Sequence, residues 1–109
     1  MKGNVYLLCD SSKENTYKIG ATRGKIGNRI KNLQTGNSGD ISIVHIYETE
    51  HPFFIENILH KRFKHKLIKN EWFGLDSEDI NNFINNCIEI ENIIYAMKDN
   101  YFFKKIIKK

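Results

Sequence analysis

Short apolar runs separated by polar turns predict three β-strands in the first half of the chain. The run over residues 5–9 ends at a polar turn, and residues 16–20 follow after a connection that suits an antiparallel hairpin. A third run, over residues 41–47, is rich in β-branched side chains and predicts a central strand. Gly20 ends the second strand, and its missing side chain lets another group approach the backbone there.

Apolar positions at helical spacing predict the first two helices. The first helix has its apolar stripe at Ile26, Ile30 and Leu33. Gly36 follows where a helix of that length should end. Pro52 fixes the backbone at a helix start without the loss of a needed donor, and the helical pattern then runs from residue 53 to about residue 68.

The second half of the chain predicts a short aromatic segment followed by helix. Residues 70–75 form a loop or short strand in which Trp72 is an aromatic anchor. The acidic residues 76–79 are typical of a helix start, and a third amphipathic helix follows through about Ile88. A further helix that breaks near Asn92 would complete the order. The fold class is therefore α+β, a small three-stranded antiparallel sheet flanked by helices.

The position of the charge is more informative than its sum. The 109 residues carry a formal net charge of +4, which would ordinarily favour a nucleic-acid partner. Residues 98–109 hold five lysines and one aspartate, so residues 1–97 sum to zero. We divide the chain into a domain over residues 1–97 and a basic, aromatic tail over residues 98–109. The tail is expected to pack against the domain.

Composition excludes several classes of protein. The chain has no apolar run of about 18 residues, so a membrane span is excluded. Two cysteines, Cys9 and Cys87, are too few for a disulfide scaffold or a cysteine-built zinc site. The N-terminus lacks the apolar stretch of a secretory signal, so we expect an intracellular protein, in the cytoplasm or the nucleus. No obligatory protein partner is evident.

Glu56 stands at the edge of the apolar face of the second predicted helix. A turn of about 100° per residue places it next to the apolar arc and puts His60 beside it. A carboxylate at a core edge is partly desolvated and favours a cation, for which a hard divalent metal is one answer. A carboxylate paired with lysine or left in water is the commoner case. For His60, the alternative is a histidine packed on the sheet edge.

Arg29 and two tyrosines are further candidates, each with an ordinary alternative. Arg29 lies at the margin of the first helix's apolar stripe, where it could clamp a phosphate or extend over the core. Tyr6 and Tyr17 fall in adjacent strands of the hairpin, where aromatic residues are common for packing reasons alone.

A basic segment with no acid separates Glu56 from Glu71. It contains Lys61, Arg62, Lys64, Lys66 and Lys69. Lys61, Lys64 and Lys69 should face outward and could follow a phosphate backbone. A solvated helix face is the equal alternative.

Five stretches, in this order, carry a family resemblance. They are Gly3-Asn4-Val5-Tyr6, Tyr17-Lys18-Ile19-Gly20, Arg29-Ile30-Lys31-Asn32-Leu33-Gln34-Thr35-Gly36-Asn37, Glu56-Asn57-Ile58-Leu59-His60-Lys61-Arg62-Phe63 and Glu71-Trp72-Phe73. Over roughly residues 3–90 the chain resembles the GIY-YIG endonucleases, in the branch common in phages, large DNA viruses and fungi. The signature glycine and isoleucine are replaced by Asn4 and Val5. Lys18 lies inside the second motif, as is typical of that branch.

The resemblance implies a metal-dependent DNA endonuclease. Glu56 would bind one divalent ion, Mg²⁺ or Mn²⁺, and Arg29 would stabilise charge on the phosphate. Tyr6 or Tyr17 would position or deprotonate the attacking water. These roles agree with the chemistry, because a phosphodiester transition state gathers negative charge that a metal and a guanidinium offset. DNA contacts are expected from Lys18, Arg23, Lys61, Lys64 and Lys69.

One departure from the family raises an alternative function. Many members carry a His or Tyr one turn after the arginine, and this chain has Leu33. His60 could replace that residue as a proton shuttle or positioning group. If it does not, the protein is a catalytically weak or inactive DNA-binding module of the same fold. Cutting both strands with one site per chain would require a homodimer or two successive nicks. Glu71 is expected to cap or pair locally, and contact with the metal or with Arg29 is the less favoured alternative.

Overall fold

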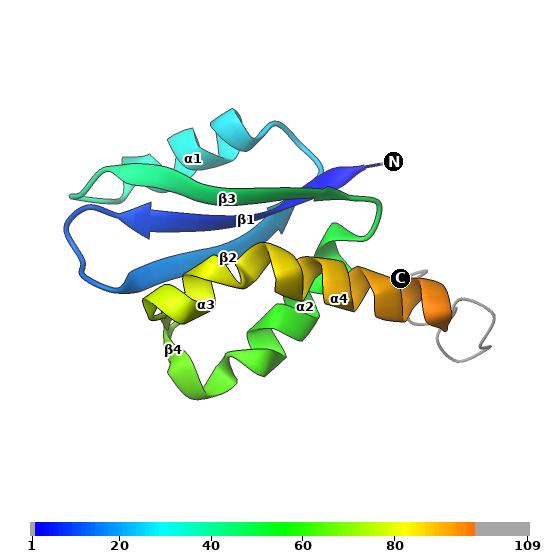
Figure 1. Cartoon of the computed structure of the whole chain (residues 1–109). Coiled ribbons are helices and arrows are strands. Elements are labelled where there is room, and N and C mark those ends of the chain that lie inside the picture. The colour runs from blue at the N-terminus through cyan, green and yellow to red at the C-terminus, as the bar shows by residue number, and fades with distance from the viewer. Residues whose placement is uncertain (1, 98–109) are drawn as a thin grey trace.

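A computed structural model describes residues 2–97 of the chain (Figure 1). The elements follow the order β1 (Gly3–Asp10), β2 (Thr16–Thr22), α1 (Ile26–Thr35), β3 (Ile41–Thr49), α2 (Pro52–Arg62), a 3-10 turn (Lys64–Lys66), β4 (Leu67–Lys69), β5 (Trp72–Gly74), α3 (Ser77–Asn81) and α4 (Phe83–Ala96). The expected α+β class is confirmed. The tail over residues 98–109, and with it the expected packing of that tail, lies outside the described residues.

The sheet differs from the prediction in size and order. It has five antiparallel strands in the order β3-β1-β2-β5-β4, where three strands were expected. β5 falls in residues 70–75, for which a loop or short strand was expected, whereas β4 was not expected. Each has three residues, which is too short for a clear alternating pattern. The prediction of a central third strand is also wrong. β3 lies at one edge, and its β-branched residues Ile43 and Ile46 are 44% and 40% exposed.

The helix starts follow the sequence more closely than the helix ends. Pro52 opens α2, and Asp76 caps α3 in a reciprocal pair with Asp79, as the acidic start predicted. The expected helix over residues 53–68 is too long. α2 ends at Arg62, and the chain turns before β4. The expected break near Asn92 is absent, because α4 runs without interruption from Phe83 to Ala96.

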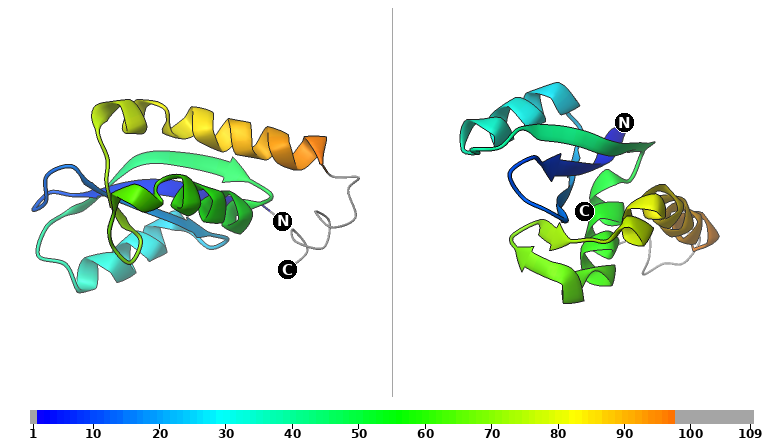
Figure 2. Two further views of the ribbon diagram at one scale, coloured as in Figure 1. Left: turned by 90° about the horizontal axis from the view of Figure 1, so that it is seen from below. Right: turned by 60° about the vertical axis from the view of Figure 1, so that its left-hand side comes forward.

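Helices cover both faces of the sheet, and each face has its own core (Figures 1 and 2). On one face, α2 and α4 pack on alternate side chains of β1 and β2. The fully buried members of this main core include Val5, Leu7, Ile19, Ile55, Leu59, Phe83 and Cys87. On the other face, α1 packs on a smaller core. This second core contains Tyr6, Leu8 and Ile41, with Ile26, Ile30, Leu33 and Trp72 around it.

The stretch after α1 fixes the loops at one end of the sheet. The Gln34 side chain donates to the Gly39 carbonyl at 2.7 Å and accepts from the Ile41 amide at 2.8 Å. Asn37 donates to the buried carboxylate of Asp10 at 2.5 Å. A Cβ on Gly39 would lie 2.1 Å from Asp10 Oδ1, so only glycine fits there. Gly36 ends α1 as predicted. Part of the family resemblance therefore reflects loop structure.

Cys9 and Cys87 are both free thiols, and burial raises the pKa of the Cys87 thiol to about 12. Among residues 2–97, no helix has the length and apolar character needed to cross a bilayer.

Candidate functional site

The site forms where the pairing between β2 and β5 stops, just before the first residue of β5. β5 pairs with β2 only at residues 16–18, and the last backbone hydrogen bond runs from the Ile19 amide to the Glu71 carbonyl at 3.1 Å. The Ile19 carbonyl is satisfied from α2 instead, because His60 Nε2 lies 2.8 Å from it. Because β5 begins only at Trp72, the edge of β2 is open beyond that point. α2 approaches β2 there, next to the Glu71 side chain.

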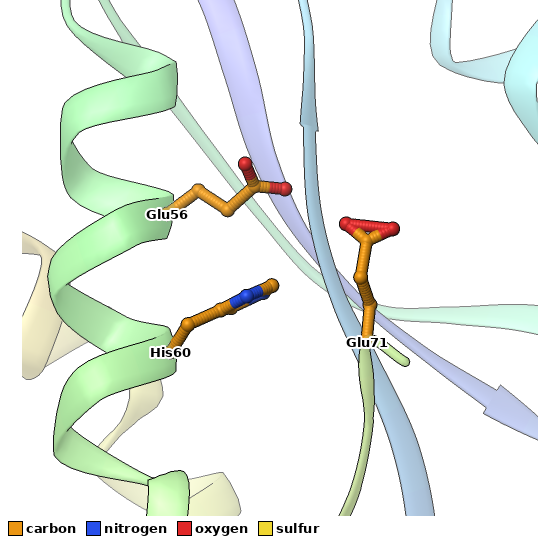
Figure 3. Close-up of side chains that lie close together, drawn as sticks. All are labelled: Glu56, His60 and Glu71. Carbon is orange, nitrogen blue, oxygen red and sulfur yellow. The ribbon is translucent and has the colours of Figure 1, made fainter. Parts of the chain in front are cut away.

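Two carboxylates and one imidazole converge at this position. Glu56 and His60 lie one turn apart on α2 and point toward Glu71, which precedes β5 (Figure 3). One ligand atom from each residue lies within 4.8 Å of the others, and all three residues are half-buried. This is the only group of its kind among residues 2–97. Oxygen and imidazole donors at this spacing can hold a divalent cation.

The charges of the site leave the two carboxylates under mutual repulsion. Burial, and next the negative charge of Glu71, raise the pKa of Glu56 to about 7. Lys18 and Arg29 act in the opposite direction. Lys18 Nζ lies 3.1 Å from Glu71 Oε2, and the Lys18 side chain is only 7% exposed. Lys18 forms an ion pair with Glu71, so an additional cation would stabilise the ionised form of Glu56.

His60 packs at the sheet edge, and its role as a proton shuttle or positioning group stays a prediction. Its ring packs on Phe73 with centroids 5.1 Å apart, as expected of a histidine at the sheet edge. A carbonyl oxygen can only accept a hydrogen bond, so the protonated Nε2 donates one to the Ile19 carbonyl. In the neutral ring the lone pair then lies on Nδ1, where it can bind a metal or take a proton. His60 is thus held in one tautomer next to Glu56.

Tyr6 and Arg29 form a second pair on the α1 face of the sheet. Arg29 Nε donates to Tyr6 Oη at 3.0 Å, and Tyr6 is fully buried. Burial raises the pKa of Tyr6 in spite of Arg29, and the charges of Glu71 and Glu56 raise it further. The charges of the two carboxylates therefore reach this phenol across β2. Gly20 lies opposite Tyr6, and a Cβ there would be 2.4 Å from the hydroxyl.

Other predicted site residues lie elsewhere or in a different setting. Tyr17 faces the side of the sheet opposite to Tyr6 and packs against the main core, so the structure does not join it to Arg29. Lys18, expected as a DNA contact, is buried within the site. Arg23 donates to the Glu50 carbonyl at 3.2 Å and lies over the ring of Phe53. Its contact with DNA stays a prediction.

The basic segment after Glu56 divides into paired and exposed residues. Arg62 pairs with Glu89 and Asn86, and Lys66 pairs with Asp76 and Asp79. The three lysines expected to face outward are exposed. These are Lys61, Lys64 and Lys69. Their accessibility agrees with a role in phosphate binding, and that role stays a prediction.

For Glu71 the sequence favoured local capping or pairing over contact with a metal or with Arg29. In the structure it pairs with Lys18, far away in the sequence, and lies beside Glu56 and His60 of α2. A single glutamate before an aromatic pair has no periodicity that would point to a site. The resemblance of Glu71-Trp72-Phe73 to a family motif was the only indication.

Comparison with known proteins gives one match. A model of the T5orf172 domain family matches residues 3–88, which is most of the chain. This phage-associated domain occurs in the context of endonuclease-like proteins and indicates a nuclease or DNA-binding role. Searches of curated proteins and of solved structures found no match.

We expect Gly20→Ala to destabilise the fold, because the new methyl group would displace the Tyr6 hydroxyl from Arg29. The loss should be about 1–3 kcal/mol in the free energy of unfolding, measured by urea denaturation. Gly27→Ala is the matched control, since a Cβ there meets nothing within 4 Å on an exposed face of α1. It should be neutral or slightly stabilising. A Gly20→Ala protein as stable as wild type would contradict this packing.

We expect Glu56→Gln to stabilise the metal-free protein above pH 7. The raised pKa of Glu56 means that the folded state binds this proton more tightly than the unfolded chain, so its ionisation opposes folding as pH rises from about 4.5 to 7. After solvent screening, the gain should be on the order of 1 kcal/mol at pH 8, or about 4 °C in Tm. It should vanish at pH 4. Melting in a chelating buffer, with the exposed Glu48→Gln as control, tests this. A variant less stable than wild type at pH 8 would contradict it.

Proposed function

The chain belongs to the T5orf172 domain family, and we propose that it is a metal-dependent DNA endonuclease of the GIY-YIG type. One observation carries the proposal: Glu56, His60 and Glu71 converge just before β5. The charges of the two carboxylates also act on Tyr6, which is hydrogen-bonded to Arg29. Carboxylates, an imidazole and a guanidinium at one place are the groups that phosphodiester hydrolysis needs.

Glu56 and Glu71 fit a divalent cation and would hold it, which leaves Nδ1 of His60 for proton transfer. Burial, and next the charge of Glu71, raise the pKa of Glu56, and a bound cation would offset both effects. Oxygen donors favour Mg²⁺ or Mn²⁺. When bound, the ion supplies Lewis-acid charge to a phosphate oxygen. Lys18 holds the Glu71 carboxylate in place from the side.

Arg29 binds the phosphate in this proposal. Its Nε is used by Tyr6, which fixes the plane of the guanidinium and leaves the Nη groups for phosphate oxygens. A guanidinium stays charged throughout the working pH range, so its charge is present as the transition state forms. Because the group is oriented before substrate arrives, little reorganisation is needed.

Tyr6 orients Arg29 and the attacking water, and His60 moves the proton. A phenol whose pKa is raised by burial stays protonated at neutral pH, so it is a poor base by itself. His60 has a fixed tautomer and can exchange a proton through Nδ1. It thereby takes the role that a His or Tyr one turn after the arginine has in many GIY-YIG endonucleases. Leu33, at that position, packs in the second core and cannot do so.

The same departure supports a second candidate function. With Leu33 in the second core, α1 has no His or Tyr one turn after Arg29. If His60 does not compensate, the protein binds DNA without cutting it, through Arg29 and the exposed lysines Lys61, Lys64 and Lys69.

A plasmid-nicking assay separates the two functions. The wild type should nick supercoiled DNA with Mg²⁺ or Mn²⁺ and not in a chelating buffer. Glu56→Gln removes a metal ligand, and Arg29→Ala removes a positive charge from the phosphate. Each should lower the rate by about 100-fold or more. The exposed Glu48→Gln should cut like wild type.

Two outcomes would decide against the nuclease. Salt-dependent DNA binding without nicking in either metal would favour the inactive module. Nicking that persists in Glu56→Gln at the wild-type rate would show that the carboxylates are not the metal site.

A further inference from the structure

A pocket with a volume of about 500 Å³ lies between three loops and is lined by Trp72, the residue that follows Glu71. Its lining comes from the β1–β2 turn, the loop after α1 and the turn between β4 and β5. It includes Lys13, Asn37, Lys69, Asn70 and the indole of Trp72, and it has no acidic residue. Two ammonium groups, two amides and an aromatic ring are a set suited to a nucleotide, which offers a phosphate and an aromatic base.

The pocket opens on the face of the sheet that carries Tyr6 and Arg29. Trp72 pairs with Lys18 across β5 and β2, and Lys18 pairs with Leu8 of β1. Directly paired residues share a face, and Leu8 lies in the second core with Tyr6. Trp72 therefore lies on the same face of the sheet as Tyr6 and Arg29.

Lys18 connects the two places directly. Its ammonium lies 3.1 Å from Glu71 Oε2 and 5.6 Å from the centroid of the Trp72 ring. The carboxylate and the indole are thus neighbours on either side of one buried lysine. A nucleotide on Trp72 would have its adjoining phosphate next to the carboxylates.

The Trp72 ring carries one fixed and one displaceable cation. Lys18 is 7% exposed and bound to Glu71, so it stays in place. Lys13 lies 5.2 Å from the ring centroid, but its side chain is 52% exposed and its ion pair with Asp10 is long, at 3.9 Å. Asp10 already accepts three other hydrogen bonds. A base can therefore replace Lys13 on the ring while that lysine turns to a phosphate.

We propose that the pocket holds one unstacked nucleotide of a DNA strand, next to the phosphate at the Glu56–His60–Glu71 site. The inference rests on the proposed function and specifies its substrate. A paired base in a continuous duplex has both faces covered by its neighbours, so it cannot stack on Trp72. The preferred substrate is therefore DNA with a single-stranded or unpaired nucleotide beside the cleaved bond.

Trp72 is the only tryptophan in the chain, so its fluorescence reports on the pocket directly. The full chain carrying Glu56→Gln is titrated with a single-stranded oligothymidylate and with a blunt duplex of the same length. We expect the single strand to quench the emission and to bind at least about tenfold more tightly than the duplex. Trp72→Ala should weaken single-strand binding by about 5- to 150-fold, whereas Trp72→Phe should retain most of it.

Lys61→Gln is the matched control, because Lys61 is exposed on α2 and does not line the pocket. It should lower the affinity for both DNA forms equally and leave the quenching at saturation unchanged. Emission that does not change with saturating single strand, equal affinity for the duplex, or wild-type binding by Trp72→Ala would overturn the proposal. Thymidine monophosphate bound as tightly as the strand would also overturn it, in favour of a free nucleotide.

The nicking assay separates failure of this inference from failure of the proposed function. Metal-dependent cutting without quenching would leave the nuclease in place and remove the pocket. Quenching by single-stranded DNA without cutting in Mg²⁺ or Mn²⁺ would support the pocket and remove the nuclease.

Discussion

The repulsion between Glu56 and Glu71 is the interaction around which the site is organised. Burial, and next the charge of Glu71, raise the pKa of Glu56 to about 7. Lys18 forms an ion pair with Glu71, and the Arg29 guanidinium is hydrogen-bonded to Tyr6. The remaining imbalance accounts for the fit of a divalent cation and links the site to the phenol on the other side of β2.

The short β5 creates the conditions for that repulsion. If β5 paired with the whole of β2, strand backbone would occupy the edge that α2 now approaches, and His60 would lose its hydrogen bond to Ile19. Because β5 begins only at Trp72, Glu71 emerges at the end of the pairing, and the aromatic side chain after it lies beside Lys18. A single strand boundary therefore places the proposed metal ligands and the proposed nucleotide pocket next to each other.

The sequence predicted the chemistry of single elements better than their meeting points. The arc of α2 placed Glu56 at the core edge beside His60, because both lie on one helix with a regular turn. The open edge of β2 could not be predicted, since β4 and β5 are too short to produce a pattern and α2 ends earlier than its apolar spacing indicated. For the same reason, local pairing was favoured for Glu71 over a role in the site. Tyr6 and Tyr17 looked equivalent in the sequence, and only the register of the hairpin puts them on opposite faces.

The most direct test of the central claim is the position of Mn²⁺ in crystals of the protein, located by its anomalous scattering. The account predicts one peak per chain in contact with Glu56 and Glu71, beside His60, and no peak there in crystals of Glu56→Gln. A peak elsewhere, or none at saturating Mn²⁺ with the two carboxylates sharing a proton, would contradict it. In that case the site would be an acid pair stabilised by Lys18, and the chain's role would be DNA binding without metal-dependent cutting.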